Sequence, residues 1–160
     1  MKKIIGIMGP GNAKEEDLEN SYKIGKYCAE NGYATLTGGL NKGVMNEALR
    51  GAQENGGLTI GILPIDDRSQ FSEYIDIPIV TTMRSGRNYI NILSSDIIVA
   101  CGMEAGTSSE VSMAIKADKK VILVGAYEEA NTFYKRLSNN QIYIAKDYKE
   151  AIKLIGGILL

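Results

Sequence analysis

The sequence contains no histidine among its 160 residues. Histidine is the commonest metal-binding side chain and the usual proton shuttle near neutral pH. Its absence excludes a histidine-based metal centre, and we expect no metal site. Any acid–base chemistry must come from carboxylates, lysine, tyrosine or water.

Cysteine and long apolar runs are also scarce. Cys28 and Cys101 are the only cysteines, and no CxxC pair occurs. Two distant thiols argue against a disulfide framework and favour a reducing compartment. No stretch approaches the roughly 20 apolar residues that span a bilayer, and the run at 4–8 is too short for a signal peptide. We therefore expect a cytoplasmic protein with no membrane partner.

Neither positive nor negative charge is in marked excess. Lys and Arg number 18 against 19 Asp and Glu, so the net charge is −1. Nucleic-acid-binding proteins normally carry a basic excess or a basic stripe, and we expect no nucleic-acid partner. The length and the hydrophobic share of 44% are typical of one folded domain, predicted over residues 1–160.

Short apolar runs alternate with longer amphipathic segments along the chain. The runs predict strands at 4–8, 33–37, 58–62, 78–81, 96–101 and 120–124, with a short edge strand at 141–145. Helical spacing predicts helices through 18–29, 44–52 and 89–93, at 107–117 and at 148–155, and no helix is predicted between 124 and 141. Near-continuous Ile/Val strands indicate a parallel sheet covered on both faces, with the 96–100 run central. The predicted fold class is α/β: a single-domain, three-layer α/β/α, Rossmann-like doubly wound parallel β-sheet.

Ligands of such sheets bind beyond the carboxyl ends of the strands, so the residues after each strand are the candidates. The second strand is followed by Gly38, Gly39 and, four residues later, Gly43 at the start of a helix. Glycines allow close backbone approach, and a helix N-terminus attracts anions such as phosphate. A tight turn is the alternative, and the spacing is neither GxGxxG nor a Walker loop. Gly9, after the first strand, either lines the same crevice or forms a plain turn.

The segment after the 96–100 strand is the second candidate. Gly106 and Thr107 open a predicted helix there, and Glu110 lies one turn further along. These residues suit a second phosphate contact, but Thr-x-x-Glu is also the capping-box pattern. The 84–88 segment is the third candidate, because Arg87 offers a planar fork for phosphate. A solvent-facing arginine is the alternative there.

Together these residues resemble the Lonely Guy (LOG) superfamily, also known as lysine-decarboxylase-like proteins, over nearly the whole chain. Residues 38–45 are similar to its GGGxxGLM loop with one glycine replaced, and Arg87 precedes an Asp-started apolar strand as in the family. Gly106, Thr107 and Glu110 match its PGGxGTxxE loop. Residues 102–104 (GME) replace the PGG stretch, and Asn88 replaces a lysine. These departures, with the sequence of residues 85–88, look more like the branch that includes molybdenum-cofactor carrier proteins.

The resemblance implies two functions. The first is a carrier-like protein that binds a phosphorylated heterocycle, such as a nucleotide or the molybdenum cofactor, as ligand and not as a required cofactor. The second is a phosphoribohydrolase that cleaves the N-glycosidic bond of a nucleoside 5′-monophosphate, with Arg87 and Glu110 as its catalytic residues. Loss of the family's double glycine in the 102–104 segment favours the carrier-like function over the hydrolase. Lysine decarboxylation is the weakest option, since no lysine stands in a distinctive context. The resemblance also implies a homodimer or higher homo-oligomer.

Overall fold

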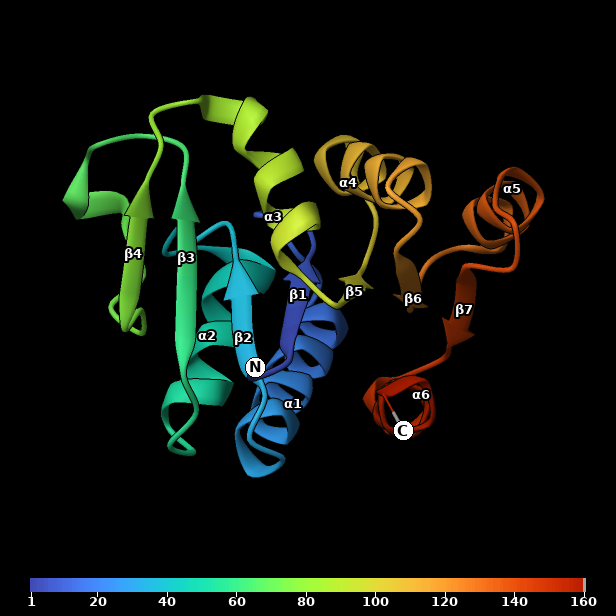
Figure 1. Ribbon diagram of the computed structural model, residues 1–160, viewed down its shortest axis with the longest axis horizontal. Coiled ribbons are helices and arrows are strands. Elements are labelled where there is room, and N and C mark those ends of the chain that lie inside the picture. The colour runs from blue at the N-terminus through green and yellow to red at the C-terminus, as the bar shows by residue number, and fades with distance from the viewer. Residues whose placement is uncertain (160) are drawn as a thin grey trace.

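A single parallel sheet runs through the computed structural model, which describes residues 1–159 (Figure 1). Its seven strands lie in the order β4-β3-β2-β1-β5-β6-β7, and every neighbouring pair is parallel. The strands are β1 (Ile4–Met8), β2 (Ala34–Thr37), β3 (Thr59–Leu63), β4 (Ile77–Val80), β5 (Ile97–Cys101), β6 (Lys120–Val124) and β7 (Ile142–Ala145). The predicted parallel Rossmann-like sheet is therefore confirmed, with strand boundaries shifted by one residue or less from the prediction.

Helices cover the two faces of the sheet and complete three layers. They are α1 (Glu15–Glu30), α2 (Gly43–Gln53), α3 (Asn88–Ser94), α4 (Ala105–Lys116), α5 (Glu128–Leu137) and α6 (Tyr148–Leu159), with short 3₁₀ turns η1 (Arg68–Gln70) and η2 (Arg84–Arg87). One core cluster joins the sheet to α1, α2 and α6, and the other joins it to α3, α4 and α5. Figure 1 shows these two groups on opposite sides of the strands. No helix within residues 1–159 is long and apolar enough to cross a bilayer.

Strand β5 shows why the apolar runs fold this way. Successive side chains of a strand point to opposite faces. Accordingly Val99 packs in the core beside α1, whereas Ile98 and Ala100 pack in the core beside α4. All five residues of β5 are buried. Because both faces are covered, every position of the strand is apolar, and β5 lies beside β1, the middle strand of the sheet.

Two expectations fail at the two ends of the sheet. Strand β4 is not covered: its four residues are exposed, with Ile77 and Ile79 both at 44%. It is the edge strand, so an apolar sequence there does not imply burial. Sequence reasoning also missed α5. This helix buries Ala130 and Tyr134, which are four residues apart and share one helix face, so a helical pattern was available.

The strand order creates a crevice between β1 and β5. The chain runs from β1 through β4 toward one edge of the sheet, then returns to place β5 on the other side of β1. The loops that follow β1 and β5 consequently lead to helices on opposite faces of the sheet, α1 and α4. In open parallel sheets such a reversal point is where ligands bind.

Candidate functional site

A cavity of about 650 Å³ opens at the carboxyl ends of the strands, at this reversal point. Its volume is in the range of small-molecule sites. The loops after β1, β2, β3 and β5 line it, together with η2. Six of the residues proposed from sequence reach it: Gly9, Gly38, Arg87, Gly106, Thr107 and Glu110. We call it the switch-point cavity. The fold thus brings together segments that are far apart in the chain.

Two of the proposed glycines do not line this cavity. Gly39 has a φ of +76° and packs toward the side chain of Leu63. Gly43 begins α2 with a φ of +56°, and a Cβ there would collide with the carbonyl oxygen of Pro10. Residues other than glycine rarely adopt such a positive φ. Both glycines therefore shape the loop that carries Gly38.

Gly38 makes room for Arg87. A Cβ on Gly38 would lie 2.5 Å from Nη2 of Arg87 and 2.7 Å from Sδ of Met45. No real side chain fits in that space, so the backbone of the β2–α2 loop lies directly against the guanidinium. The glycine and the arginine, almost fifty residues apart, form one wall of the cavity.

Arg87 is buried, so the solvent-facing interpretation is wrong. It ends η2, its Nη1 donates a hydrogen bond to Oδ1 of Asn88 at 2.6 Å, and its Nε has no partner. Burial lowers the pKa of the guanidinium, and the nearby Glu110 carboxylate partly offsets that effect. A guanidinium has five N–H donors. An unpartnered buried donor is costly, and an anionic ligand in the cavity would satisfy it.

Glu110 faces Arg87 across the floor of the cavity. Its Oε1 lies 3.9 Å from Nη1 of Arg87 and accepts a hydrogen bond from Nδ2 of Asn91 at 3.3 Å. Burial raises the pKa of the Glu110 carboxyl to about 7, although Arg87 and Asn91 both act to lower it. A carboxyl with such a pKa exists in both protonation states near neutrality, which suits proton transfer or pH-dependent binding.

The capping-box interpretation of Thr107 and Glu110 is wrong. Helix α4 begins at Ala105, two residues earlier than predicted, and Glu104 occupies its N-cap position. Thr107 therefore lies inside the helix, where its Oγ1 is buried without a hydrogen-bond partner. Both side chains line the cavity and neither caps the helix. Their spacing of three residues places them on one helix face.

Sequence reasoning missed Asn91. Its Nδ2 holds Glu110, and its Oδ1 is buried without a partner. A signal was available, because Asn88 and Asn91 are three residues apart and follow Arg87 directly. Two amides on one face of a short helix after a candidate arginine favour a polar site over a packing surface. Asp67 and Gln70 of the η1 segment line the same cavity, from a stretch described only as polar and irregular.

The cavity is equipped to bind an anion. Arg87 supplies a cation, Thr107 a hydroxyl, and the first turn of α4 free backbone N–H groups. Among residues 1–159 no group of three or more His, Cys, Asp or Glu side chains could hold a metal ion. Cys28 and Cys101 are both buried in the core beside α1, and neither lines the cavity.

Solved structures with this fold and similar sequences include molybdenum-cofactor proteins. The molybdenum cofactor binding protein of Rippkaea orientalis is 45% identical with a TM-score of 0.96, covering 100% of this chain and 99% of that one. The molybdenum cofactor carrier protein of Chlamydomonas reinhardtii is 44% identical with a TM-score of 0.94, covering 99% of each chain.

Sequence comparison assigns the family. An uncharacterized protein of Archaeoglobus fulgidus is 38% identical over 117 residues, which are 73% of this chain and 76% of the relative. The sequence profile of the SLOG cluster4 family matches residues 2–152. That match spans every strand of the sheet and every loop that lines the cavity. The chain therefore belongs to the SLOG cluster4 family.

Proposed function

We propose that this protein is a carrier that binds a phosphorylated heterocycle in the switch-point cavity, and that the molybdenum cofactor is its ligand. The observation that carries the proposal is the set of buried, unpartnered polar atoms lining or bordering that cavity: Nε of Arg87, Oγ1 of Thr107 and Oδ1 of Asn91. Native proteins pair nearly all buried polar atoms. Three such atoms around one cavity indicate groups that a ligand completes.

The choice of ligand rests on the similar structures. The molybdenum cofactor appears in the names of two proteins that match this chain over nearly its whole length. The cavity adds chemical support, because Arg87 suits a phosphate and no thiol competes for the metal. Asp67 and Gln70 also line the cavity and hydrogen-bond to each other, and their remaining polar groups suit the hydrogen-bonding edge of a heterocycle.

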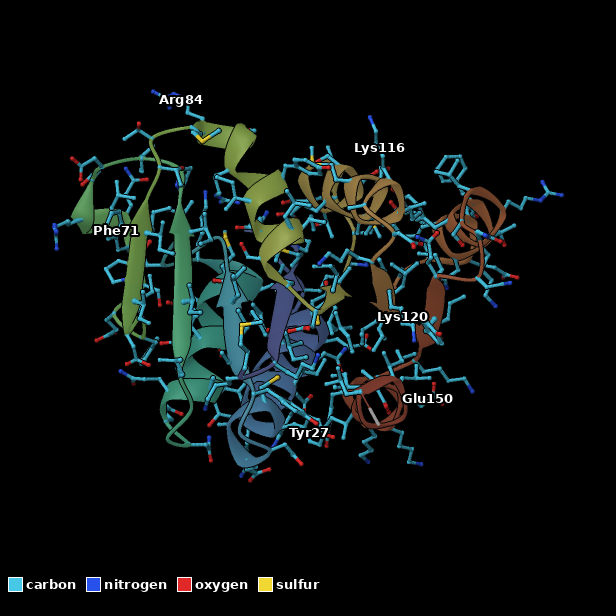
Figure 2. The ribbon with its side chains drawn as sticks, in the orientation of Figure 1. Tyr27, Phe71, Arg84, Lys116, Lys120 and Glu150 are labelled. Atoms are coloured by element: carbon cyan, nitrogen blue, oxygen red, sulfur yellow. The ribbon has the colours of Figure 1, made fainter. Side chains whose placement is uncertain are left out.

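The test is what the protein retains when it is produced in a bacterial host that makes the molybdenum cofactor. Purified without oxygen, the protein should retain molybdenum and a pterin, measured by elemental analysis and by fluorescence of the oxidised pterin. Arg87→Ala should retain much less, whereas Arg136→Ala, which removes an exposed arginine of α5 outside the cavity, should retain nearly as much. Arg84 is not a suitable control because it lines the cavity, although Figure 2 shows it at the outer rim, extending away from the ribbon. Retention of a nucleotide without molybdenum would contradict the choice of ligand.

A second candidate function rests on the pair formed by Arg87 and Glu110. A buried carboxylate beside a cation is able to stabilise an oxocarbenium-like transition state. The alternative is therefore hydrolysis of a nucleoside 5′-monophosphate at its N-glycosidic bond. Release of free base from AMP, followed by chromatography, tests it directly. The negative charge of Glu104, which lines the cavity, favours the carrier, whereas Met103 packs against the core.

We also propose that the protein forms a homodimer or a larger homo-oligomer. Apolar side chains are exposed on β4 and α3 and in the segment between them, including Met83 at 53% and Leu93 at 52%. Exposed apolar patches are typical of interaction surfaces. Light scattering should give a mass that is a multiple of 17.4 kDa, and Leu93→Glu should lower it. A monomeric mass for the wild type would contradict this proposal.

A further inference from the structure

Glu104 has an unusual position at the mouth of the switch-point cavity. It is the N-cap residue of α4, with an extended backbone (φ −142°, ψ −179°), yet its side chain makes no capping hydrogen bond. Its Oε1 instead accepts a hydrogen bond from the backbone N–H of Gly11, at 3.3 Å. The carboxylate thus reaches from the loop after β5 to the loop after β1, across the crevice.

The place that this carboxylate occupies is where an anion would be bound. Above Gly106, in the first turn of α4, the one atom that an added Cβ would meet within 4 Å is Oε1 of Glu104, at 3.9 Å. The first N–H groups of that turn have no partner within the helix. The N–H of Gly11 is already donated to the same oxygen, and the methylene groups of Lys42 lie close to Gly11. The loop after β1 and the start of α4 therefore meet at one carboxylate oxygen.

A second observation shows that this space is built for a ligand. Thr107, in the first turn of α4, is 1% exposed and lines the cavity, and its buried Oγ1 has no hydrogen-bond partner. The Glu104 carboxylate satisfies Gly11 but leaves Thr107 unsatisfied. A phosphate carries more oxygens than a carboxylate and extends farther into the cavity, so it is able to satisfy both.

We propose that Glu104 is an internal substitute for the ligand's phosphate, displaced when the ligand binds, and that it sets the affinity of the cavity for anions. The inference deepens the proposed function, on which it rests. An incoming phosphate must break the contact with Gly11 and then tolerate the displaced carboxylate nearby. Glu104 therefore weakens binding of every phosphate monoester and favours ligands that make further contacts deeper in the cavity. Free phosphate and simple nucleotides are selected against.

Neutralising Glu104 while preserving its shape tests this inference. Glu104→Gln should bind AMP roughly tenfold or more tightly than wild type, because the neutral amide does not repel the phosphate, although its oxygen is still able to accept the hydrogen bond from Gly11. Binding of adenosine should not change, because it has no phosphate. Glu128→Gln is the matched control, since it removes one exposed carboxylate at the start of α5, outside the cavity. Calorimetry gives the affinities, and the amide resonance of Gly11 should move during an AMP titration of the wild type.

The outcomes separate the inference from the proposed function. Equal or weaker AMP binding by Glu104→Gln would overturn the inference, because a carboxylate with only a structural role gives no gain in affinity when its charge is removed. Failure of both proteins to bind AMP would overturn it too. The carrier function would remain tested by the retention of molybdenum and pterin in the wild type, which does not depend on this variant.

Discussion

The carboxylate of Glu110 lies 3.9 Å from the guanidinium of Arg87, and both side chains are 9% exposed. The distance is too long for a direct hydrogen bond, so the two charges attract each other without being locked together. Arg87 consequently keeps N–H donors for a ligand. Glu110 keeps a raised pKa, because the nearby cation does not fully offset the cost of burial. The predictions below depend on this loosely coupled pair and on the glycine that makes room for it.

Replacing Arg87 with alanine should weaken binding of a nucleoside monophosphate by roughly ten- to a hundred-fold. That is the cost of losing charge-assisted hydrogen bonds of about 1.5–3 kcal/mol. Affinity for the corresponding nucleoside should be nearly unchanged. Titration calorimetry with AMP and adenosine measures both. Equal AMP affinities for wild type and Arg87→Ala would show that the phosphate lies elsewhere.

Replacing Glu110 with glutamine separates the two candidate functions. If the protein is a hydrolase, the variant should lose release of free base while still binding AMP, because Glu110 would act mainly in the transition state. If the protein is a carrier, the wild type should release no base, and the variant should differ only in affinity or stability. Free base released equally by both proteins would contradict a catalytic role for Glu110.

The same substitution should change how stability depends on pH. The pKa of Glu110 is raised from 4.5 to about 7 on folding. Between these pH values the folded protein binds more protons than the unfolded chain, so the stability contributed by this group falls as the pH rises. A shift of that size corresponds to about 3 kcal/mol. Urea unfolding should show Glu110→Gln gaining stability relative to wild type between pH 5 and pH 8. A difference independent of pH would contradict the raised pKa.

Replacing Gly38 with alanine should damage the cavity through Arg87. The new Cβ would lie 2.5 Å from Nη2 of that arginine, so the guanidinium must move. We expect AMP binding to fall at least as far as in Arg87→Ala, with a loss of stability of about 1–3 kcal/mol from overpacking. Gly157→Ala is the control, because no atom lies within 4 Å of its added Cβ. Thermal unfolding and calorimetry compare the two variants, and unchanged binding in Gly38→Ala would contradict the close packing.

The apolar runs and the helical spacing of the sequence predicted the strands and most of the helices, because each pattern reflects the burial of residues close together in the chain. A run such as 97–101 is apolar at every position since both of its faces are covered, and that regularity is visible without a structure. The loop positions of Gly38, Arg87 and Gly106 followed from the rule that ligands bind beyond the carboxyl ends of parallel strands. Helix α5 was missed although Ala130 and Tyr134 have the spacing of a buried helix face, and although α6, which also buries only two residues, was predicted.

The sequence by itself determined the parallel α/β fold and the segments that carry the candidate site, because burial and strand alternation are encoded residue by residue. Only the tertiary structure decided that Arg87 is buried against Gly38, that Glu110 faces Arg87 and does not cap its helix, and that Glu104 reaches Gly11. Those outcomes depend on the strand order, which places the loops after β1, β2 and β5 side by side. Contacts between residues 93 positions apart, as for Gly11 and Glu104, leave no local pattern in the chain.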